Sequence, residues 1–306
     1  MKVKHRYTNL DSVDTHKTMK DMLQWQQERK QKKKDLSILI KEAPTKEIEQ
    51  LHANRSATSI TWIGHSTFLI QMNGLNMITD PVWAKRMGFQ KRLTEPGIPL
   101  AKLPPIDYVF ISHGHYDHLD FATIKRLPGD PTFFVPIGLG RSFKWRGYKK
   151  VIESEWYDSF IVDELTFTFV PAQHWTKRTL TDTNTSHWGG WILESPNDSI
   201  YFVGDTGYFR GFKEISEKFS IQTVLMPIGA YEPEWFMQES HLTPEEAIQA
   251  FIELKGSTLI PMHYGTYHLA DDTGSEAIDR LDAEWNRRSL AESVKKKLMI
   301  GETLWV

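Results

Sequence analysis

The sequence contains no cysteine. This absence excludes disulfide bonds, a thiolate nucleophile and zinc sites built from thiolates. The chain also lacks any run of about 18 apolar residues, so no membrane-spanning helix is expected. Its first residues, Met-Lys-Val-Lys-His, do not form the apolar core of a secretory signal. We therefore expect a cytoplasmic protein whose reactive groups are oxygen and nitrogen side chains.

A large excess of charge of one sign is also missing. The 37 Lys and Arg residues nearly balance the 39 Asp and Glu residues, which gives a formal net charge of −2. Overall charge therefore does not favour nucleic acid as a partner. The 306 residues are 40% hydrophobic and 12% aromatic, which is ample for a sizeable core in one large domain or two ordinary ones.

Residues 1–57 are polar, lack glycine entirely and carry a basic run from Arg29 to Lys34. A helix with a modest apolar face is indicated there by Met19, Met22, Leu23 and Trp25. Two interpretations stay open: a solvated helix packed on the domain surface, or a basic contact with an anionic membrane at its inner face. We expect residues 1–57 to form an N-terminal helical extension packed on a domain of residues 58–306.

From residue 58 onward, short apolar runs bounded by turn residues predict alternating strands and helices. Strands are predicted over 59–63, 67–72, 76–79, 108–111, 132–135, 151–152, 160–162, 165–170, 188–193, 199–203, 223–226 and 258–262, with a short one at the end. Helices are predicted over 121–126, 212–219, 243–254 and 275–285. Thr243, followed by Pro244 and by Glu246 three residues after the cap, is a strong signal for a helix start.

Three histidines and an aspartate, His113, His115, Asp117 and His118, directly follow the apolar run 108–111. Because alternate residues of an extended chain project to the same side, His113 and His115 can bind one ion. Asp117 and His118 lie on a turning segment and can face a second ion. A single loop histidine is usually solvated or hydrogen-bonded, but four such residues at a strand end are hard to explain by packing. The motif predicts a metal centre of nitrogen and oxygen ligands, which zinc accepts.

An apolar strand followed by a ligand-type residue recurs at His174, Asp205 and His263. Asp205, within Gly-Asp-Thr-Gly, could also be an ordinary turn residue. Strand ends that point at one edge of a sandwich would gather these side chains with the first group.

The pattern His-x-His-x-Asp-His at 113–118 resembles the signature of the metallo-β-lactamase superfamily of binuclear metallohydrolases. The resemblance implies an α/β fold, the αββα four-layer sandwich, with the metals at one edge. It implies that His113, His115 and His174 hold one ion, that Asp117, His118 and His263 hold the other, and that Asp205 bridges both. Two Zn²⁺ ions, for which Mn²⁺ or Fe²⁺ could stand, would make a bridging hydroxide available as the nucleophile.

A closer resemblance, to the N-acylphosphatidylethanolamine-hydrolysing phospholipase D family, covers roughly residues 58–270. It is carried by the segments 62–67, 79–81, 173–180, 227–233, 240–247 and 262–266. It implies a phospholipase D-like phosphoric diester hydrolase in which His241 assists catalysis beside the metal ligand Asp117. Ser240 departs from the pattern, because mammalian members carry Gln there, and residues 1–57 match poorly.

Metal-bound imidazoles need an acceptor for their second N–H group. We expect Asp80 to be that acceptor, with Asp120 behind it, and His65 to be either a similar supporting residue or a turn residue. Lys177 and Arg178 are expected either to neutralise a phosphate or to lie in a solvated loop.

The expected partner is a phospholipid or another small-molecule substrate, with no nucleic acid, and a homodimer is left open. The alternative function is metal-dependent hydrolysis of a soluble ester or a sugar-phosphate lactone on the same fold. A metal-binding protein without turnover is a third possibility, against which the complete ligand set and His241 argue.

Overall fold

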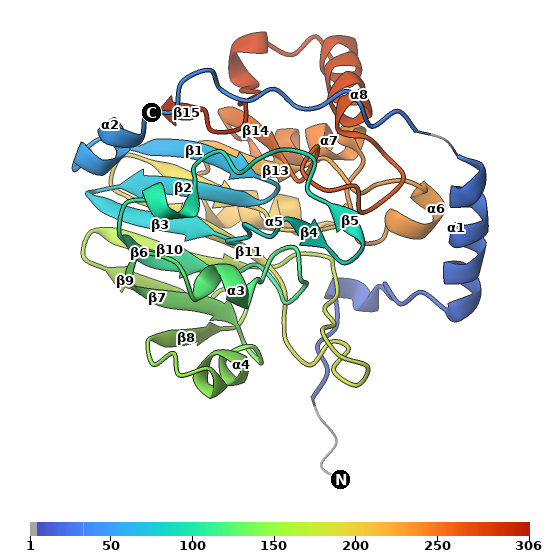
Figure 1. The fold of residues 1–306 in the computed structure, drawn as a ribbon, viewed down its shortest axis with the longest axis horizontal. Helices are drawn as coiled ribbons and strands as arrows, with labels where there is room; N and C mark the ends of the chain where they lie inside the picture. The colour runs from blue at the N-terminus through green and yellow to red at the C-terminus, as the bar shows by residue number, and fades with distance from the viewer. Residues whose placement is uncertain (1–4, 33) are drawn as a thin grey trace.

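Two stacked β-sheets with helices on both outer faces make up the fold (Figure 1). The computed structural model describes residues 5–32 and 34–306. In spatial order the first sheet contains β15 (Thr303–Trp305), β1 (Ser59–Gly64), β2 (Thr67–Met72), β3 (Leu75–Thr79), β6 (Ile106–Phe110), β7 (Gly129–Pro136) and β8 (Val151–Ser154). The second contains β14 (Thr258–Met262), β13 (Thr223–Pro227), β12 (Ser199–Phe202), β11 (Gly190–Glu194), β10 (Leu165–Val170) and β9 (Ser159–Val162). The predicted αββα sandwich is confirmed.

The helices divide between the two outer faces. The first sheet is covered by α2 (Ile48–Ala53), α3 (Phe121–Ile124) and α4 (Gly140–Trp145), whose Leu51, Ile124 and Phe143 pack in one cluster with its outward side chains. The second sheet is covered by α5 (Gly211–Lys218), α7 (Pro244–Leu254) and α8 (Gly274–Arg287). The sequence did not predict α4, α6 (Glu234–Met237) or the hairpin of β4 (Arg86–Met87) and β5 (Gln90–Lys91), because such short elements leave no periodic pattern.

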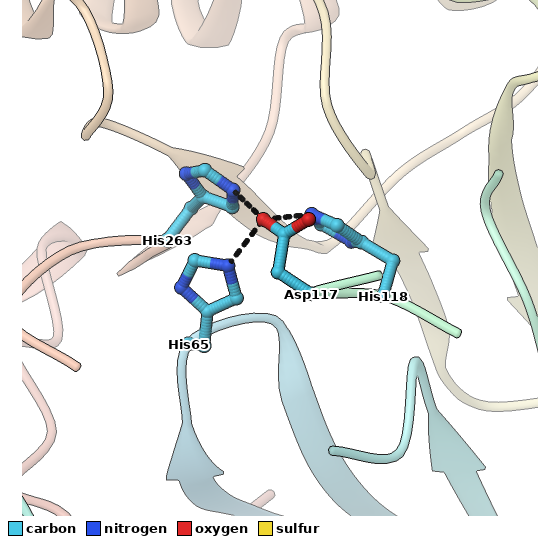
Figure 2. A group of neighbouring side chains, drawn as sticks. All are labelled: His65, Asp117, His118 and His263. Carbon is cyan, nitrogen blue, oxygen red and sulfur yellow. Dashed lines mark hydrogen bonds and ion pairs between the residues drawn. The ribbon is translucent and has the colours of Figure 1, made fainter. Parts of the chain in front are cut away.

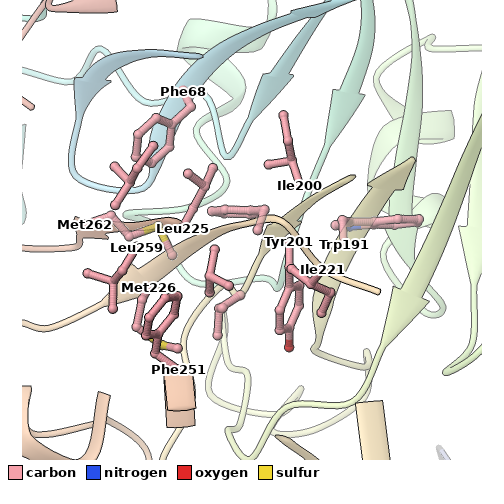
Figure 3. Close-up of a cluster of buried hydrophobic side chains, with 14 of the residues drawn as sticks. Phe68, Trp191, Ile200, Tyr201, Ile221, Leu225, Met226, Phe251, Leu259 and Met262 are labelled. Carbon is pink, nitrogen blue, oxygen red and sulfur yellow. The ribbon is translucent and has the colours of Figure 1, made fainter. Parts of the chain in front are cut away.

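Alternation along the central strands supplies side chains to both cores. Phe110 of β6 and Phe134 of β7 face the space between the sheets, where each ring packs against Phe167 of β10. Val109 and Phe133, their neighbours in the chain, belong to the cluster under the first layer of helices. Figure 3 shows the part of the core around β12, β13 and β14, including Leu225 and Leu259. Strands buried on both faces explain the nearly continuous apolar runs in the sequence.

Helix α1 (Met19–Gln31) lies against the loop that follows β14. The indole Nε1 of Trp25 donates to Asp271 at 3.0 Å, and Arg29 forms an ion pair with the same buried carboxylate at 3.2 Å. Lys34 pairs with Glu276 at 2.5 Å, whereas Lys33 of the predicted basic run lies outside the described residues. Lys32 also lies 3.9 Å from Asp271, so three charges of that run are paired with acidic side chains of this chain. The division of the chain at residue 57 stays a prediction.

The predicted start of α7 is confirmed in detail. The Thr243 hydroxyl accepts from the Glu246 amide at 3.2 Å, and the Glu246 carboxylate accepts from the Thr243 amide at 3.0 Å. This capping box fixes the direction in which the chain enters the helix, just after His241.

Among the described residues, no helix is both long and apolar enough to cross a membrane.

Candidate metal centre

The predicted ligands are brought together because several strands end at one edge of the sandwich. Strands β12, β13 and β14 are parallel, and β10 runs in the same direction because β11 is antiparallel to both β10 and β12. Their carboxyl ends therefore meet, and His174, Asp205 and His263 follow the ends of β10, β12 and β14. Strand β6 of the facing sheet delivers His113 to the same place.

Three imidazoles form the first cluster. His115 Nδ1 lies 2.9 Å from His113 Nε2 and 3.2 Å from His174 Nε2. Ligand atoms of all three rings are within 4.8 Å of one another, which is within reach of a single ion. His113 and His174 are fully buried, so their nitrogens face one another rather than solvent.

The second cluster surrounds the carboxylate of Asp117, as Figure 2 shows. Asp117 Oδ2 lies 3.0 Å from His65 Nε2, 3.4 Å from His118 Nε2 and 3.6 Å from His263 Nε2. His65 lies in the turn between β1 and β2, and from there it contacts Asp117 of the predicted second ligand set.

Asp205 lies between the two clusters. Its Oδ2 is 3.2 Å from His118 Nε2 and 3.1 Å from His263 Nε2 in the second cluster. The same oxygen is 4.0 Å from His113 Nε2 and 3.9 Å from His174 Nε2 in the first. One carboxylate oxygen thus faces both sets of imidazoles, which is the position that a bridging ligand requires.

Several buried polar atoms of the site form no hydrogen bond within the described part of the chain. They include Asp205 Oδ1 and His241 Nδ1, and also His118 Nε2 and His263 Nε2, which lie close to Asp205 Oδ2 without hydrogen-bond geometry. A buried polar atom without a partner is costly, and here such atoms converge on one space. Divalent cations would satisfy them, and imidazole nitrogen with carboxylate oxygen is a donor set that zinc, manganese and iron accept. The residues present therefore fit the metals that the sequence predicts.

Outer hydrogen bonds fix how the imidazoles are oriented. His118 Nδ1 lies 2.6 Å from Asp80 Oδ2, and the Ser112 hydroxyl, which donates to Asp80, lies 2.9 Å from His113 Nδ1. His174 Nδ1 donates to the main-chain carbonyl of Ser240 at 2.9 Å. Each of these bonds leaves Nε2 of the ring free for an ion. The side chain of Ser240 takes no part, so its departure from the family pattern leaves this contact intact.

Asp120 was predicted as the second candidate acceptor for an imidazole N–H group, after Asp80, but the structure places it elsewhere. Its carboxylate accepts from the Ala122 amide at 3.0 Å and from the Thr123 hydroxyl at 2.7 Å, and so it caps α3. The correction has a physical reason, because an aspartate directly before a helix is a preferred capping residue.

Positive φ angles occur at three residues of the site: His65 (55°), Asp80 (32°) and His263 (63°). Non-glycine residues rarely adopt such angles, and they persist where the surrounding structure holds them. Gly204, next to Asp205, has a φ of 71°, and a Cβ atom there would lie 2.8 Å from Ser112 Cβ. The backbone around the ligands is therefore closely fixed.

The two clusters differ in their protonation. Burial lowers the pKa of His115 to about 4 and those of His113 and His174 well below the usual range, so these rings are neutral at pH 7. Burial opposes protonation of His263 too, but the carboxylates Asp205 and Asp117 raise its pKa to about 9. Against the same opposing burial, Asp205, Asp117 and Asp80 raise the pKa of His118 well above the usual range.

We expect metal binding at the second cluster to release protons. At pH 7 the rings of His118 and His263 are protonated in the metal-free chain. An imidazole must be neutral to bind an ion, so about two protons leave when the ion binds. The apparent affinity should rise with pH, and it should rise less steeply above about pH 9, where His263 loses its proton in the metal-free chain. Calorimetric titration with Zn²⁺ in buffers of different ionisation enthalpy measures the release. Binding without proton release would contradict this protonation state.

Arg178 is half-buried and donates hydrogen bonds within the chain, so it does not lie in a freely solvated loop, and its pairing with a phosphate stays a prediction. Its Nη1 donates to the carbonyls of Gly114 at 2.8 Å, His115 at 3.3 Å and Leu119 at 2.9 Å, and its guanidinium stacks over Tyr116. This one side chain therefore supports the loop that carries four predicted ligands.

Replacing Arg178 by Met should keep the packing of the stem but remove these hydrogen bonds. We expect the free energy of unfolding to fall by about 2 kcal/mol, because the carbonyls of the buried residues Gly114 and Leu119 lose this donor. We also expect metal retention to weaken. Chemical denaturation and metal analysis after dialysis measure both effects. The control is Lys177→Met at the neighbouring exposed position, which should change neither. A wild-type result for Arg178→Met would show that the contacts are dispensable.

A family model described as a beta-lactamase superfamily domain matches residues 75–264. N-acyl-phosphatidylethanolamine-hydrolyzing phospholipase D 1 of Caenorhabditis elegans is 39% identical over 233 residues, which are 70% of this chain and 65% of that protein. An uncharacterized protein of Mycobacterium tuberculosis is 39% identical over 239 residues, 74% of this chain and 63% of that protein. This chain thus spans just under two thirds of the length of these relatives.

The solved structure of a metallo hydrolase from Ignicoccus hospitalis has the same fold. It superposes with a TM-score of 0.63 and 22% sequence identity, and the match covers 82% of this chain and 99% of that one.

Proposed function

This chain belongs to the β-lactamase superfamily of metal-dependent hydrolases, and from that membership we propose that it is a binuclear metal-dependent phosphodiesterase of the N-acylphosphatidylethanolamine phospholipase D type. The observation that carries the proposal is the position of Asp205 Oδ2, which faces two separate sets of imidazoles. The similarity to the Caenorhabditis elegans phospholipase D supports the choice of substrate class. Zinc is the proposed metal, with manganese or iron as alternatives that the same donors accept.

Two bound divalent cations would supply a hydroxide nucleophile near neutral pH and would offset the charge of a phosphoryl group. The chain's own residues prepare the site for this. His113, His115 and His174 are kept neutral by burial and offer lone pairs, while Asp117 and Asp205 stay ionised. Asp205 Oδ2 lies between the two sets of donors and would contact both ions.

His241 is the proposed contact to the substrate. Its Nδ1 lies 3.9 Å from Asp205 Oδ2, and its side chain is 15% exposed, whereas those of His113 and His174 are at most 1% exposed. A substrate can therefore reach His241 from solvent while the ligands behind it stay dry. Burial lowers its pKa to about 4, so at pH 7 the ring is neutral and offers one N–H donor and one lone pair.

Contact with a membrane surface is also a proposal. Met19 and Leu23 on α1 are 75% and 55% exposed, and Phe89 in the turn of the β4–β5 hairpin is 98% exposed. Exposed apolar side chains of this size next to basic residues are suited to a lipid surface. The basic run contributes less than its sequence indicates, since Arg29 and Lys34 are already paired with acidic side chains.

The test compares three substrates with the zinc-loaded protein: N-acylphosphatidylethanolamine in anionic vesicles, an aryl phosphodiester, and a sugar-phosphate lactone. The proposal predicts hydrolysis of both phosphodiesters, with phosphatidic acid as the lipid product. Turnover of the lactone or a soluble ester without either phosphodiester would replace the proposal by the alternative function. Cleavage of the aryl diester but not of the lipid would support the proposed phosphodiesterase reaction but contradict the proposed phospholipid substrate.

A further inference from the structure

The N-terminal segment reaches a metal ligand from more than 150 positions away in sequence. Asn9 Oδ1 accepts a hydrogen bond from the main-chain amide of His174 at 2.9 Å, and the Thr15 hydroxyl donates to the His174 carbonyl at 3.4 Å. His174 lies beyond the end of β10, in a stretch without regular secondary structure. Because His174 is fully buried, both of its main-chain groups need partners inside the protein.

The residues around His174 are held by other parts of the chain. The Gln173 amide donates to the Thr206 hydroxyl at 2.9 Å, and the Gln173 carbonyl accepts from the Gly207 amide at 2.8 Å. The main chain of Thr176 pairs with Asn184 in both directions. Within the described part of the chain, the partners of both His174 main-chain groups come from residues 5–18 alone.

Asn9 is buried, with 6% of its surface exposed, and all its contacts suit an amide. Its Oδ1 accepts from His174 N and also from the indole Nε1 of Trp188 at 2.9 Å, while its Nδ2 donates to the Val13 carbonyl at 3.1 Å. Trp188 is fully buried and also donates to the Ala172 carbonyl at 3.1 Å. The side-chain amide of Asn9 therefore connects three parts of the chain: the segment after β10, the segment just before β11, and the N-terminal segment itself.

The segment is fastened on both sides of Asn9. The Tyr7 amide donates to the Asn184 carbonyl at 2.8 Å, and the Tyr7 ring stacks on His187 at 4.5 Å. Asp11 forms an ion pair with Arg210 at 2.7 Å. In Figure 1 this dark blue segment accordingly runs beside the yellow-green loop around residue 180 before it reaches α1. Asn9 is therefore held in place rather than left at the end of a loose chain.

We infer that Asn9 is a positioning residue for the metal ligand His174, so that residues 5–18 are part of the metal centre and not only an extension packed on the domain. The His174 ring is fixed at Nδ1 by the Ser240 carbonyl, and its backbone is fixed by Asn9 and Thr15. Together these contacts set where Nε2 stands relative to His115 Nδ1. The inference rests on the metal centre and is independent of the substrate class.

The test measures metal binding directly, with Co²⁺ as the probe. In Asn9→Leu, which has a similar volume but no acceptor, we expect the affinity for one of the two ions to fall by about tenfold, as for other supporting contacts of metal ligands, and the visible absorption of bound Co²⁺ to change. Asn9→Asp keeps an acceptor oxygen and should recover at least part of the affinity. The control Asp11→Asn alters an exposed pair of the same segment and should match the wild type.

A second variant covers the case in which Asn9→Leu does not fold. Thr15→Val removes only the hydroxyl that donates to the His174 carbonyl, and we expect a smaller loss of Co²⁺ affinity, about two- to threefold, in the same site. Wild-type affinity and an unchanged Co²⁺ spectrum in Asn9→Leu would overturn the inference, as would an Asn9→Asp variant no better than Asn9→Leu, or an unaffected Thr15→Val. Because no substrate is used, failure of the proposed phosphodiesterase activity cannot imitate any of these results.

Discussion

Replacing Asp205 by Asn is expected to lower kcat/KM for an aryl phosphodiester by at least about 100-fold and to release much of the bound metal. The physical reason is its position, with Oδ2 at 3.1 Å from His263 Nε2 and 3.2 Å from His118 Nε2, while it also faces the first cluster. A neutral amide offers less charge to two cations and could not bridge them equally well. The electrostatic contribution of a bound metal amounts to several kcal/mol, and about 1.4 kcal/mol is a factor of ten.

Asp120→Asn is the matched control for this variant. It makes the same chemical change in the same region, but Asp120 caps α3, and Asn caps helices about as well as Asp. We expect its metal content and turnover to be those of the wild type. Elemental analysis of both variants after dialysis, together with initial rates, measures the difference. An Asp205→Asn protein with two tightly bound ions and normal turnover would show that this carboxylate is not a bridge.

Removing the imidazole of His241 is expected to lower kcat/KM by about 10- to 100-fold while leaving the metals in place. Its ring is neutral at pH 7, because burial lowers its pKa to about 4. The expected contribution is therefore an N–H hydrogen bond to the substrate rather than proton transfer from an imidazolium. A hydrogen bond to a charged group is worth about 1.5–3 kcal/mol, which sets the size of the loss.

Two measurements identify what His241 does. His241→Gln keeps an N–H donor and should recover part of the activity that His241→Ala loses. Diesters with good and poor leaving groups should lose similar activity if His241 binds a phosphoryl oxygen, whereas a general acid would matter most for the poor leaving group. Near-normal turnover of a poor-leaving-group diester by His241→Ala would exclude both roles.

The cluster of candidate metal ligands could be predicted from the sequence, because its members follow strands that the apolar pattern reveals. His113 and His115 share one local motif, and His174, Asp205 and His263 each come shortly after an apolar run. Once those strands are placed in parallel directions, their ends meet at one edge. Asp80 was predictable for a related reason, since a buried imidazole needs an acceptor and Asp80 follows β3, next to β6 in the first sheet.

The contacts that orient the ligands could not be predicted in the same way. Ser240 acts through its main-chain carbonyl, which no side-chain pattern marks, and Arg178 and Asn9 act across 59 and 165 positions of sequence. Only the packing of the chain decides which distant segment meets a buried main-chain group. Asp120 is different, because an Asp directly before a predicted helix was a visible capping signal.

The central claim is that two ions held by one chain perform the reaction, and a metal titration tests it most directly. Metal-free protein is titrated with Zn²⁺ while bound metal and hydrolysis of an aryl phosphodiester are followed together. The account predicts that turnover rises to a plateau at about two ions per chain, in step with occupancy of the second cluster. Full turnover at one ion per chain, or turnover that does not depend on metal, would contradict it.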